Sequence, residues 1–190
     1  MKKILIAVLA ALLCPAFAQA PGTKTLKGVT LPVTLGRSGK ILSLNGMGIR
    51  TKVVFKVYVG ALYVERPSKA ADELISSEQD KAMELVFLRG VDGKAIADAI
   101  DEGFKKNSKE LLPALRERMD KLRGFIPDLK KGDKILFAYA GGKNLSVEIN
   151  GRNIGEIEGR DFADALFRCW LGNFPADKDL KKGLLGEIGG

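Results

Sequence analysis

Hydrophobic and polar residues alternate along the first third of the chain, after an apolar N-terminal leader. Residues 29–33 and 40–44 have the pattern of short strands, and the glycine-containing stretch 36–39 between them predicts a hairpin. Residues 44–50, LNGMGIR, are interpreted as a tight turn that leads into a long strand over residues 51–65. Both faces of that strand carry apolar residues, so we expect a central strand that is covered on both sides.

Helical spacing of apolar residues dominates the middle of the chain. A short helix capped by Ser68 is expected to run through residue 75, and residues 82–89 predict the next strand. From residue 92 to residue 124 the apolar positions recur every three or four residues, which indicates helix. Ser108 and Pro113 predict that this region is divided into two helices or kinked.

The last third of the chain returns to strands and ends in helices. Three alternating segments predict a meander, with a strong two-residue turn at Asn150-Gly151, and two helical segments follow. The predicted strands are 135–140, 145–149 and 152–158, and the predicted helices are 161–171 and 179–185. This order of elements favours the α+β class, with an antiparallel sheet and helices packed on one face.

The N-terminus has the organisation of a secretory signal, with two lysines, an apolar run and small residues before a cleavage site. Cleavage after Ala18 is favoured over cleavage after Ala20, because Pro21 would then follow the scissile bond. We expect residues 1–18 to be a signal peptide, residues 19–190 to form a single domain, and the protein to be periplasmic. Cys14 also allows a lipoprotein anchor, although leucines stand where a lipidation site carries a small residue.

Removal of this leader takes away two lysines and Cys14, so the formal net charge falls from +8 to +6 and Cys169 is the one remaining cysteine. A single cysteine excludes an internal disulfide. The chain has no histidine, which excludes Ser-His-Asp triads, Cys-His pairs and the usual zinc sites. We expect no metal and no cofactor, and catalysis would depend on Arg, Lys, Tyr, Asp or Glu.

The positive charge does not point to a nucleic-acid partner. The lysine pairs at 105–106, 130–131 and 181–182 are scattered and interleaved with acidic residues, without an arginine-rich stripe, so we interpret them as solvated surface. The leader has an apolar run of about ten residues, and no other stretch approaches the roughly 20 that a transmembrane helix needs. We therefore expect no membrane span.

Arg50 is the most informative polar residue, because it stands at the start of a strand that should be buried. A guanidinium there either reaches solvent or holds an anion in a partly dry pocket through bidentate hydrogen bonds. Tyr58 would point to the same face of an unbroken strand, but about 26 Å away. Joint action of the two residues therefore requires a bend or bulge near Thr51; otherwise they are a surface arginine and a core tyrosine.

Residues 44–50, followed by 55–65 (FKVYVGALYVE), resemble the family of chalcone isomerase and the chalcone-isomerase-like fatty-acid-binding proteins. In that family a G-x-G-x-R segment leads into a strand that ends in a Y-L-E-like triplet. Residues 169–173, CWLGN, are similar to the closing helix of the family, which ends in a glycine before a short final helix. The likeness covers roughly residues 28–186 and implies an open-faced β-sandwich.

The resemblance also implies positions around a ligand. In the isomerase an arginine, a threonine, a tyrosine, an asparagine and a second threonine surround a polyphenolic substrate. These positions fall, in that order, at Arg50, Tyr58, Ala95 or Ile96, Glu102 and Cys169. All but the arginine therefore depart from the catalytic pattern. An arginine with a tyrosine in place of the threonine is closer to the fatty-acid-binding branch, where the two groups hold the lipid carboxylate.

Glu102 and Cys169 each allow two interpretations. Glu102 is either a general base whose pKa is raised in an apolar cleft or, as we favour, a solvated residue on the outer face of its helix. Cys169 is either a nucleophile or, as we favour, a small core residue. The predicted ligand-binding residues are Arg50, Tyr58, Cys169 and Glu102, with no catalytic residue among them.

These observations predict a periplasmic, non-catalytic binding protein for an apolar, carboxylate-headed small molecule such as a fatty acid. The ligand would lie in a cleft between sheet and helices, with its tail against residues such as Phe104 and Leu166. One alternative is an isomerase or intramolecular lyase that acts on a phenolic or enone compound, with Arg50 as electrostatic catalyst. The other is a module that binds a protein or membrane partner through its sheet face or basic surface.

Overall fold

The computed structural model describes residues 22–187, so the expected signal peptide at 1–18 and its cleavage site lie outside the described residues. The elements, in chain order, are β1 (Thr23–Leu26), β2 (Val29–Pro32), β3 (Thr34–Arg37), β4 (Lys40–Lys52), β5 (Phe55–Val64), α1 (Ala71–Ser76), β6 (Lys81–Phe87), α2 (Gly93–Asn107), the 3-10 helix η1 (Lys109–Leu111), α3 (Leu112–Phe125), β7 (Lys134–Tyr139), β8 (Asn144–Ile149), β9 (Arg152–Glu158), α4 (Arg160–Leu171) and α5 (Lys178–Leu184). None of the described helices is long and apolar enough to cross a bilayer.

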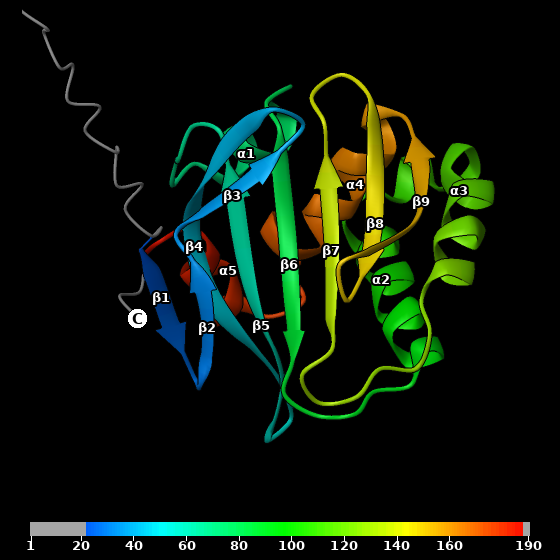
Figure 1. Ribbon diagram of the computed structural model, residues 1–190. Coiled ribbons are helices and arrows are strands. Elements are labelled where there is room, and N and C mark those ends of the chain that lie inside the picture. Colours follow the sequence, from blue (N-terminus) through cyan, green and yellow to red (C-terminus); the bar gives the residue numbers. More distant parts are fainter. Residues whose placement is uncertain (1–21, 188–190) are drawn as a thin grey trace, which may run out of the picture.

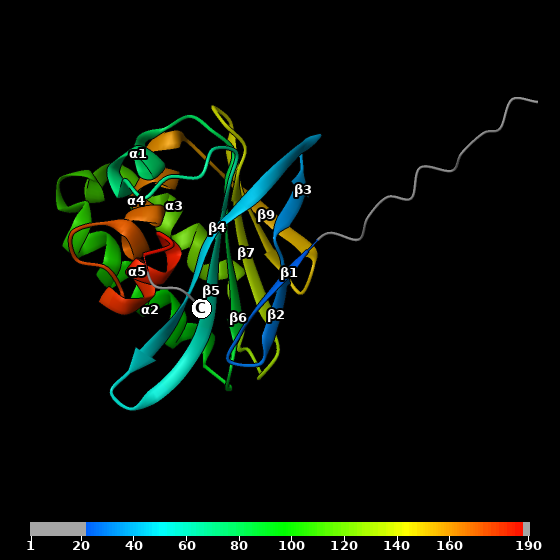
Figure 2. The same ribbon diagram turned by 90° about the vertical axis from the view of Figure 1, so that its left-hand side faces the viewer.

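A seven-stranded sheet forms the centre of the molecule, and its strands follow one another in chain order from β3 to β9 (Figure 1). Every neighbouring pair is antiparallel. The helices lie on one face of the sheet, and the separate β1–β2 hairpin lies on the other face (Figure 2). The predicted α+β class, with an antiparallel sheet and helices packed on one face, is therefore confirmed.

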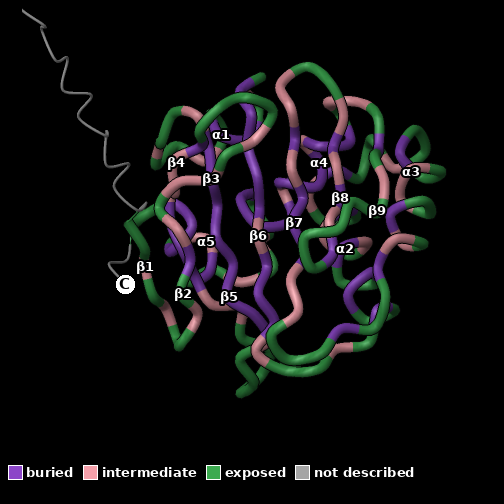
Figure 3. Tube along the Cα trace, viewed as in Figure 1, coloured by how far each residue is buried: buried purple, intermediate pink, exposed green. Residues whose placement is uncertain are grey.

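Both faces of the sheet bury apolar side chains, but the helix side buries far more. The core there combines residues of the central strands with the inner faces of α2 and α4, including Phe137 and Trp170, whose rings are 5.7 Å apart. On the opposite face, Tyr63 packs beneath the β1–β2 hairpin and its hydroxyl donates a hydrogen bond to the carbonyl of Pro32 at 2.9 Å. β5 is buried from Tyr58 to its end, which confirms a central strand covered on both sides (Figure 3).

The stretch 44–50 is not a turn, and this corrects the sequence interpretation. It lies inside β4, which pairs with β5 through to Lys52 opposite Phe55, so the turn of this hairpin falls at residues 53–54. Gly46 and Gly48 are needed for close approach rather than for a positive φ. A Cβ on Gly48 would lie 2.6 Å from the carbonyl oxygen of Leu180, because the backbone of α5 packs directly on β4.

The other predicted boundaries need smaller corrections. The hairpin turn near 36–39 is present and joins β3 to β4, but residues 29–32 pair with β1 instead. α1 begins at Ala71, and Ser68 lies before it, where its hydroxyl accepts a hydrogen bond from the backbone N–H of Ala70. The predicted division of the long helical region is confirmed, because α2 and α3 are separated at Ser108.

Candidate functional site

A β-bulge brings the first two candidate residues together. Arg50 on β4 is the direct partner of Tyr58 on β5, whereas Thr51 is the partner of Lys56. Val57 is therefore an extra residue that bends β5. The irregularity near Thr51 that joint action of Arg50 and Tyr58 requires is therefore present. The two residues lie on neighbouring strands of a hairpin, so the separation of about 26 Å expected along a single strand does not arise.

The segment before α5 holds the end of β4 in place. Asp177 caps α5 by accepting the backbone N–H groups of Asp179 and Leu180, and its second carboxylate oxygen accepts the N–H of Thr51 at 2.9 Å. One residue earlier, the carbonyl of Ala176 accepts a hydrogen bond from Nη1 of Arg50 at 3.0 Å. These contacts fix the backbone and one nitrogen of Arg50 at the edge of the helix layer.

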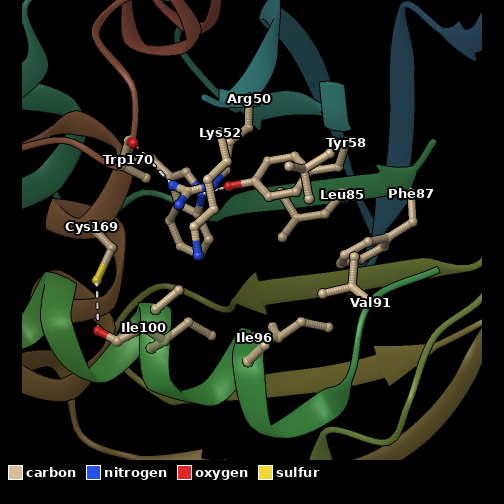
Figure 4. A pocket seen from close by; sticks show the side chains of 14 residues that line it. Arg50, Lys52, Tyr58, Leu85, Phe87, Val91, Ile96, Ile100, Cys169 and Trp170 are labelled. Carbon is tan, nitrogen blue, oxygen red and sulfur yellow. Dashed lines mark hydrogen bonds between the residues drawn. The ribbon is translucent and has the colours of Figure 1, made fainter. Parts of the chain in front are cut away.

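A cleft of about 90 Å³ lies between the sheet, α2 and α4, with Arg50, Lys52 and Tyr58 among the residues that line it (Figure 4). Its lining also includes Cys169, Trp170 and Ala176 from the C-terminal part of the chain. Its apolar walls come from Val57, Leu85, Phe87, Val91, Ala95, Ile96, Ala99 and Ile100. The predicted location of a cleft between sheet and helices agrees with this arrangement.

The Tyr58 hydroxyl lies at the polar end of the cleft. It accepts a hydrogen bond from Nε1 of Trp170 at 2.9 Å, and its ring packs against Phe87 with the centroids 5.6 Å apart. Burial raises the pKa of Tyr58 to about 12, although the Arg50 charge and the Trp170 hydrogen bond act in the opposite direction. The hydroxyl therefore stays protonated at neutral pH, and because its oxygen already accepts from Trp170, its hydrogen can be donated to a ligand.

The charge of the lining is positive. Arg50 and Lys52 are its basic side chains, and no carboxylate belongs to the lining among residues 22–187. Within the same range, Arg50 makes one hydrogen bond, to Ala176, which leaves other N–H groups of the guanidinium available. Two cations and a hydroxyl donor at one end of apolar walls suit an amphipathic molecule with an anionic head.

Cys169 lines the inner part of the cleft. Its Sγ lies 3.7 Å from the carbonyl oxygens of Ile100 and Ala165, and burial raises the pKa of the thiol. A Cβ on Gly103 would lie 2.6 Å from Sγ, so Cys169 also stands where α2 and α4 pack closely. A protonated, buried thiol is a weak nucleophile, which agrees with the favoured interpretation of a small core residue.

Glu102 lies outside the cleft. Its side chain is 63% exposed and forms an ion pair with Lys106 at 2.6 Å. The hydrogen bond from Lys106 lowers the pKa of Glu102, which is opposite to the raised pKa that a general base in an apolar cleft would require. The structure therefore contradicts that interpretation, and the residue does not belong to the lining.

Phe104 and Leu166, the expected contacts of a ligand tail, are not part of the cleft either. Both are fully buried in the helix-side core, where the ring of Phe104 packs against Phe162 at a centroid distance of 5.3 Å. The apolar walls are formed instead by Ile96 and Ile100, which lie two turns and one turn before Phe104 on the same stripe of α2. The helical pattern identified this stripe but not which of its turns border the cleft.

Lys52 and Trp170 are the functional candidates that the sequence interpretation missed. Lys52 was assigned to the beginning of a buried strand, but it is the last residue of β4 and lines the mouth of the cleft. Trp170 lies on the buried side of α4, and its hydrogen bond to Tyr58 joins residues 112 positions apart in the sequence. The adjacency of Trp170 to Cys169 was the one available signal.

Comparisons with known proteins address this fold and its cleft. The family model described as chalcone isomerase-like matches residues 23–186. The chain belongs to the chalcone isomerase-like family. The Ala95 and Ile96 positions, which the resemblance placed around the family ligand, lie in the cleft with Arg50 and Tyr58.

One similar solved structure is the crystal structure of the fatty-acid binding protein AtFAP1 of Arabidopsis thaliana, with a TM-score of 0.72 and 16% sequence identity. The likeness covers 87% of this chain and 97% of that protein. The shared fold is therefore nearly complete over both molecules. A comparison with curated protein sequences found no match.

Proposed function

We propose that this protein binds an apolar small molecule with a carboxylate head, such as a fatty acid, without chemical turnover. The observation that carries the proposal is the polarity of the cleft, with Arg50, Lys52 and Tyr58 at one end, apolar walls, and no carboxylate in the described lining. The name of the structural neighbour, a fatty-acid binding protein, adds support at the level of the fold. All ligands of this class have an anionic head joined to an apolar body.

The size of the cleft adds a requirement to this proposal. Its volume of about 90 Å³ is below the roughly 300–1,000 Å³ of pockets that enclose drug-sized ligands. A long acyl chain must therefore widen the gap between α2 and the sheet or extend past the rim of the cleft. Ala95 and Ala99 form part of the α2 wall and are exposed, so the rim there is low and open to solvent.

Binding without turnover is favoured over isomerase activity because the groups that could exchange a proton with a substrate are either kept protonated by burial or lie outside the cleft. Burial raises the pKa of Tyr58 to about 12 and also raises that of Cys169, and Glu102 lies outside the cleft. Arg50 could still stabilise a phenolate, but it would act without a general base. We expect no chalcone cyclisation above the spontaneous rate. Saturable, stereoselective flavanone formation that Arg50→Ala abolishes would establish the isomerase instead.

We propose further that the protein is exported and acts in the periplasm after cleavage behind Ala18. The support is the lysine-containing start and the short apolar run of the leader. Intact-mass measurement of the protein from the periplasmic fraction should give a chain that begins at Gln19. A dominant product that still carries Met1 would contradict export with cleavage.

The direct test of the proposed ligand class is calorimetry with three compounds that share one chain, dodecanoate, dodecanol and dodecyltrimethylammonium. A chain enclosed by the widened cleft buries about ten methylenes, which contributes on the order of 8 kcal/mol before association costs, so micromolar affinity for dodecanoate is expected. The neutral and cationic compounds should bind more weakly, since the cleft offers two cations and one hydroxyl donor to the head.

Arg50→Ala should reduce the preference for dodecanoate over dodecanol, whereas the matched control Arg116→Ala, on the exposed surface of α3, should retain it. Equal binding of the three compounds would remove the role of an anionic head. Absence of binding to all three would contradict the ligand class as a whole.

A further inference from the structure

The tip of the β4–β5 hairpin is apolar and exposed, unlike the rest of the hairpin. Val53 is 88% exposed, Val54 77% and Phe55 57%, and the three residues are consecutive. The tip projects beyond the body of the molecule (Figure 2). In the tube view it is exposed, whereas the strands behind it are buried (Figure 3). Single exposed apolar residues are common on protein surfaces, but a projecting run of them at a loop tip indicates an interaction site.

The backbone of the turn makes this composition more unusual. Residues 53–54 form a two-residue loop between the paired residues Lys52 and Phe55, and Val53 has a φ of +59°. A β-branched residue rarely adopts this conformation, and a hairpin turn of this length ordinarily has glycine or asparagine there. The apolar side chain at this position is therefore not explained by the requirements of the turn.

Basic residues surround the apolar tip. Lys52 and Lys56 flank it in the sequence, the guanidinium of Arg89 lies over the ring of Phe55 at 4.5 Å, and Lys27 lies beside Lys56. The nearby Lys27 ammonium lowers the pKa of Lys56, so the two like charges repel one another. None of the four basic residues forms an ion pair within residues 22–187. An anionic surface would compensate this cluster.

We propose that the hairpin tip docks on an anionic lipid bilayer, with residues 53–55 inserted at the interface and Lys27, Lys52, Lys56 and Arg89 against the lipid headgroups. A small apolar insertion combined with clustered cations is how peripheral proteins attach to such surfaces. A protein partner fits less well, because a specific interface buries about 800 Å² on each side, far more than three side chains on a narrow turn can provide.

The position of the tip connects docking with the cleft. Lys52 and Val57, which stand on either side of the tip, both line the cleft. A docked tip would therefore hold the mouth of the cleft close to the headgroups. The docking proposal itself does not depend on the proposed ligand, because its test measures attachment to vesicles and not occupancy of the cleft.

The test is co-sedimentation of the full-length mature protein with two kinds of vesicle, pure phosphatidylcholine and a mixture of phosphatidylcholine with phosphatidylglycerol. The wild-type protein should partition onto the mixed vesicles at least about tenfold more strongly, since several cations near an anionic leaflet each contribute a several-fold factor. Raising the salt concentration should weaken this partition.

Two double variants separate the apolar and the charged contributions. Val53→Gly/Val54→Ser removes the apolar tip and should lower partition by about tenfold, while glycine relieves the positive φ and keeps or raises the thermal midpoint. Lys27→Gln/Lys56→Gln should lower partition onto the mixed vesicles by about tenfold and leave partition onto phosphatidylcholine unchanged.

Lys105→Gln/Lys109→Gln is the matched control. It removes the same charge from two exposed lysines, Lys105 in the last turn of α2 and Lys109 at the start of η1. This end of α2 lies near α1 rather than near the hairpin tip, so the variant should partition like the wild type. The proposal is overturned if the wild-type protein stays in the supernatant with both kinds of vesicle. It is also overturned if the control loses as much partition as Lys27→Gln/Lys56→Gln, because attachment would then reflect net charge alone.

Discussion

Two basic residues, Lys81 and Arg50, lie among buried aromatic side chains, and their surroundings differ sharply. Lys81 begins β6, is buried, and its ammonium donates hydrogen bonds to three carbonyl groups around the end of α1. The acceptors are Leu74 at 3.0 Å, Ser77 at 3.1 Å, and Ile75.

Further groups complete the surroundings of Lys81. A carboxylate oxygen of Asp164 lies 3.6 Å from the ammonium, and the rings of Tyr139 and Phe167 lie within 5.4 and 5.3 Å. The three N–H donors of the ammonium are therefore all used by the protein itself.

Arg50 has no such set of partners among the described residues. It gives one hydrogen bond to the carbonyl of Ala176, forms no ion pair within residues 22–187, and lies beside the hydroxyl of Tyr58 at the end of an apolar cleft. A cation whose donors are all satisfied internally stabilises the fold, whereas one whose donors point into a cleft can hold a ligand. The two residues should therefore separate stability from binding when they are changed.

The largest expected effect is on stability, from Lys81→Met. It leaves the carbonyl groups at the end of α1 without their donor and Asp164 without one of its two basic neighbours, which should lower the free energy of unfolding by about 3 kcal/mol. Urea denaturation measures this directly. Arg50→Ala, as the matched change, should cost less than about 1.5 kcal/mol, because it removes one partly exposed hydrogen bond. Equal losses in the two variants would contradict the contrast between them.

The second prediction concerns the pH dependence of stability. Burial lowers the pKa of Lys81 to about 8 from its ordinary 10.5, although the carboxylate of Asp164 acts in the opposite direction. Between these two values the unfolded chain binds more protons than the folded one, so the free energy of unfolding should rise as pH increases. Over the full interval the rise is on the order of 3 kcal/mol.

Urea titrations at pH 7.5 and at pH 9.5 test this rise, and Lys81→Met serves as the control that should lack it. The difference between wild type and variant isolates the contribution of Lys81 from that of every other titrating group. A wild-type stability that falls in parallel with that of the variant would show that Lys81 stays charged throughout this range.

The third prediction concerns ligand binding, for which Arg50 rather than Lys81 should be the important cation. Arg50→Ala should weaken dodecanoate binding by about 1.5–3 kcal/mol, because a hydrogen bond to a charged group in a partly dry cleft is lost. Arg50→Lys should restore only part of this, since the planar fork of the guanidinium is absent. Calorimetry at a pH where the proteins are folded measures both. Unchanged affinity in Arg50→Ala would make this residue structural.

The fold class and most of the elements were predictable from sequence, because alternation and helical spacing are local signals; β1 and the full length of β4 were not. The role of Gly46 and Gly48 was not, since the turn interpretation could not include α5, which packs on them from more than 130 positions later in the chain. The pairing of Arg50 with Tyr58 was predictable only as a requirement for a bend near Thr51. Its form, a hairpin with Val57 bulged, depends on the turn at residues 53–54.

The errors in the predicted site residues have a similar cause. The family resemblance places Glu102 at the ligand, and the apolar pattern of α2 places Phe104 there, but the packing partners of the helix decide which residues border a cleft. Gly103 packs against Cys169 of α4, Glu102 faces solvent, and Phe104 is buried in the core. Ile96 and Ile100, two turns and one turn earlier on the same stripe as Phe104, line the cleft. Such contacts between distant segments cannot be inferred from periodicity alone.

The smallest predicted effect is that of Tyr58→Phe, which should weaken dodecanoate binding by about 0.5–1.5 kcal/mol, as expected for a neutral hydrogen bond. The hydroxyl stays protonated because burial raises its pKa to about 12, so it can donate to a carboxylate at neutral pH. The same substitution also leaves Nε1 of Trp170 without its acceptor, which should lower the free energy of unfolding by a comparable amount. Calorimetry with dodecanoate and with dodecanol separates the two consequences. Loss of affinity for dodecanoate alone indicates a hydrogen bond to the head, whereas equal loss for both compounds would assign Tyr58 to the packing of the cleft wall.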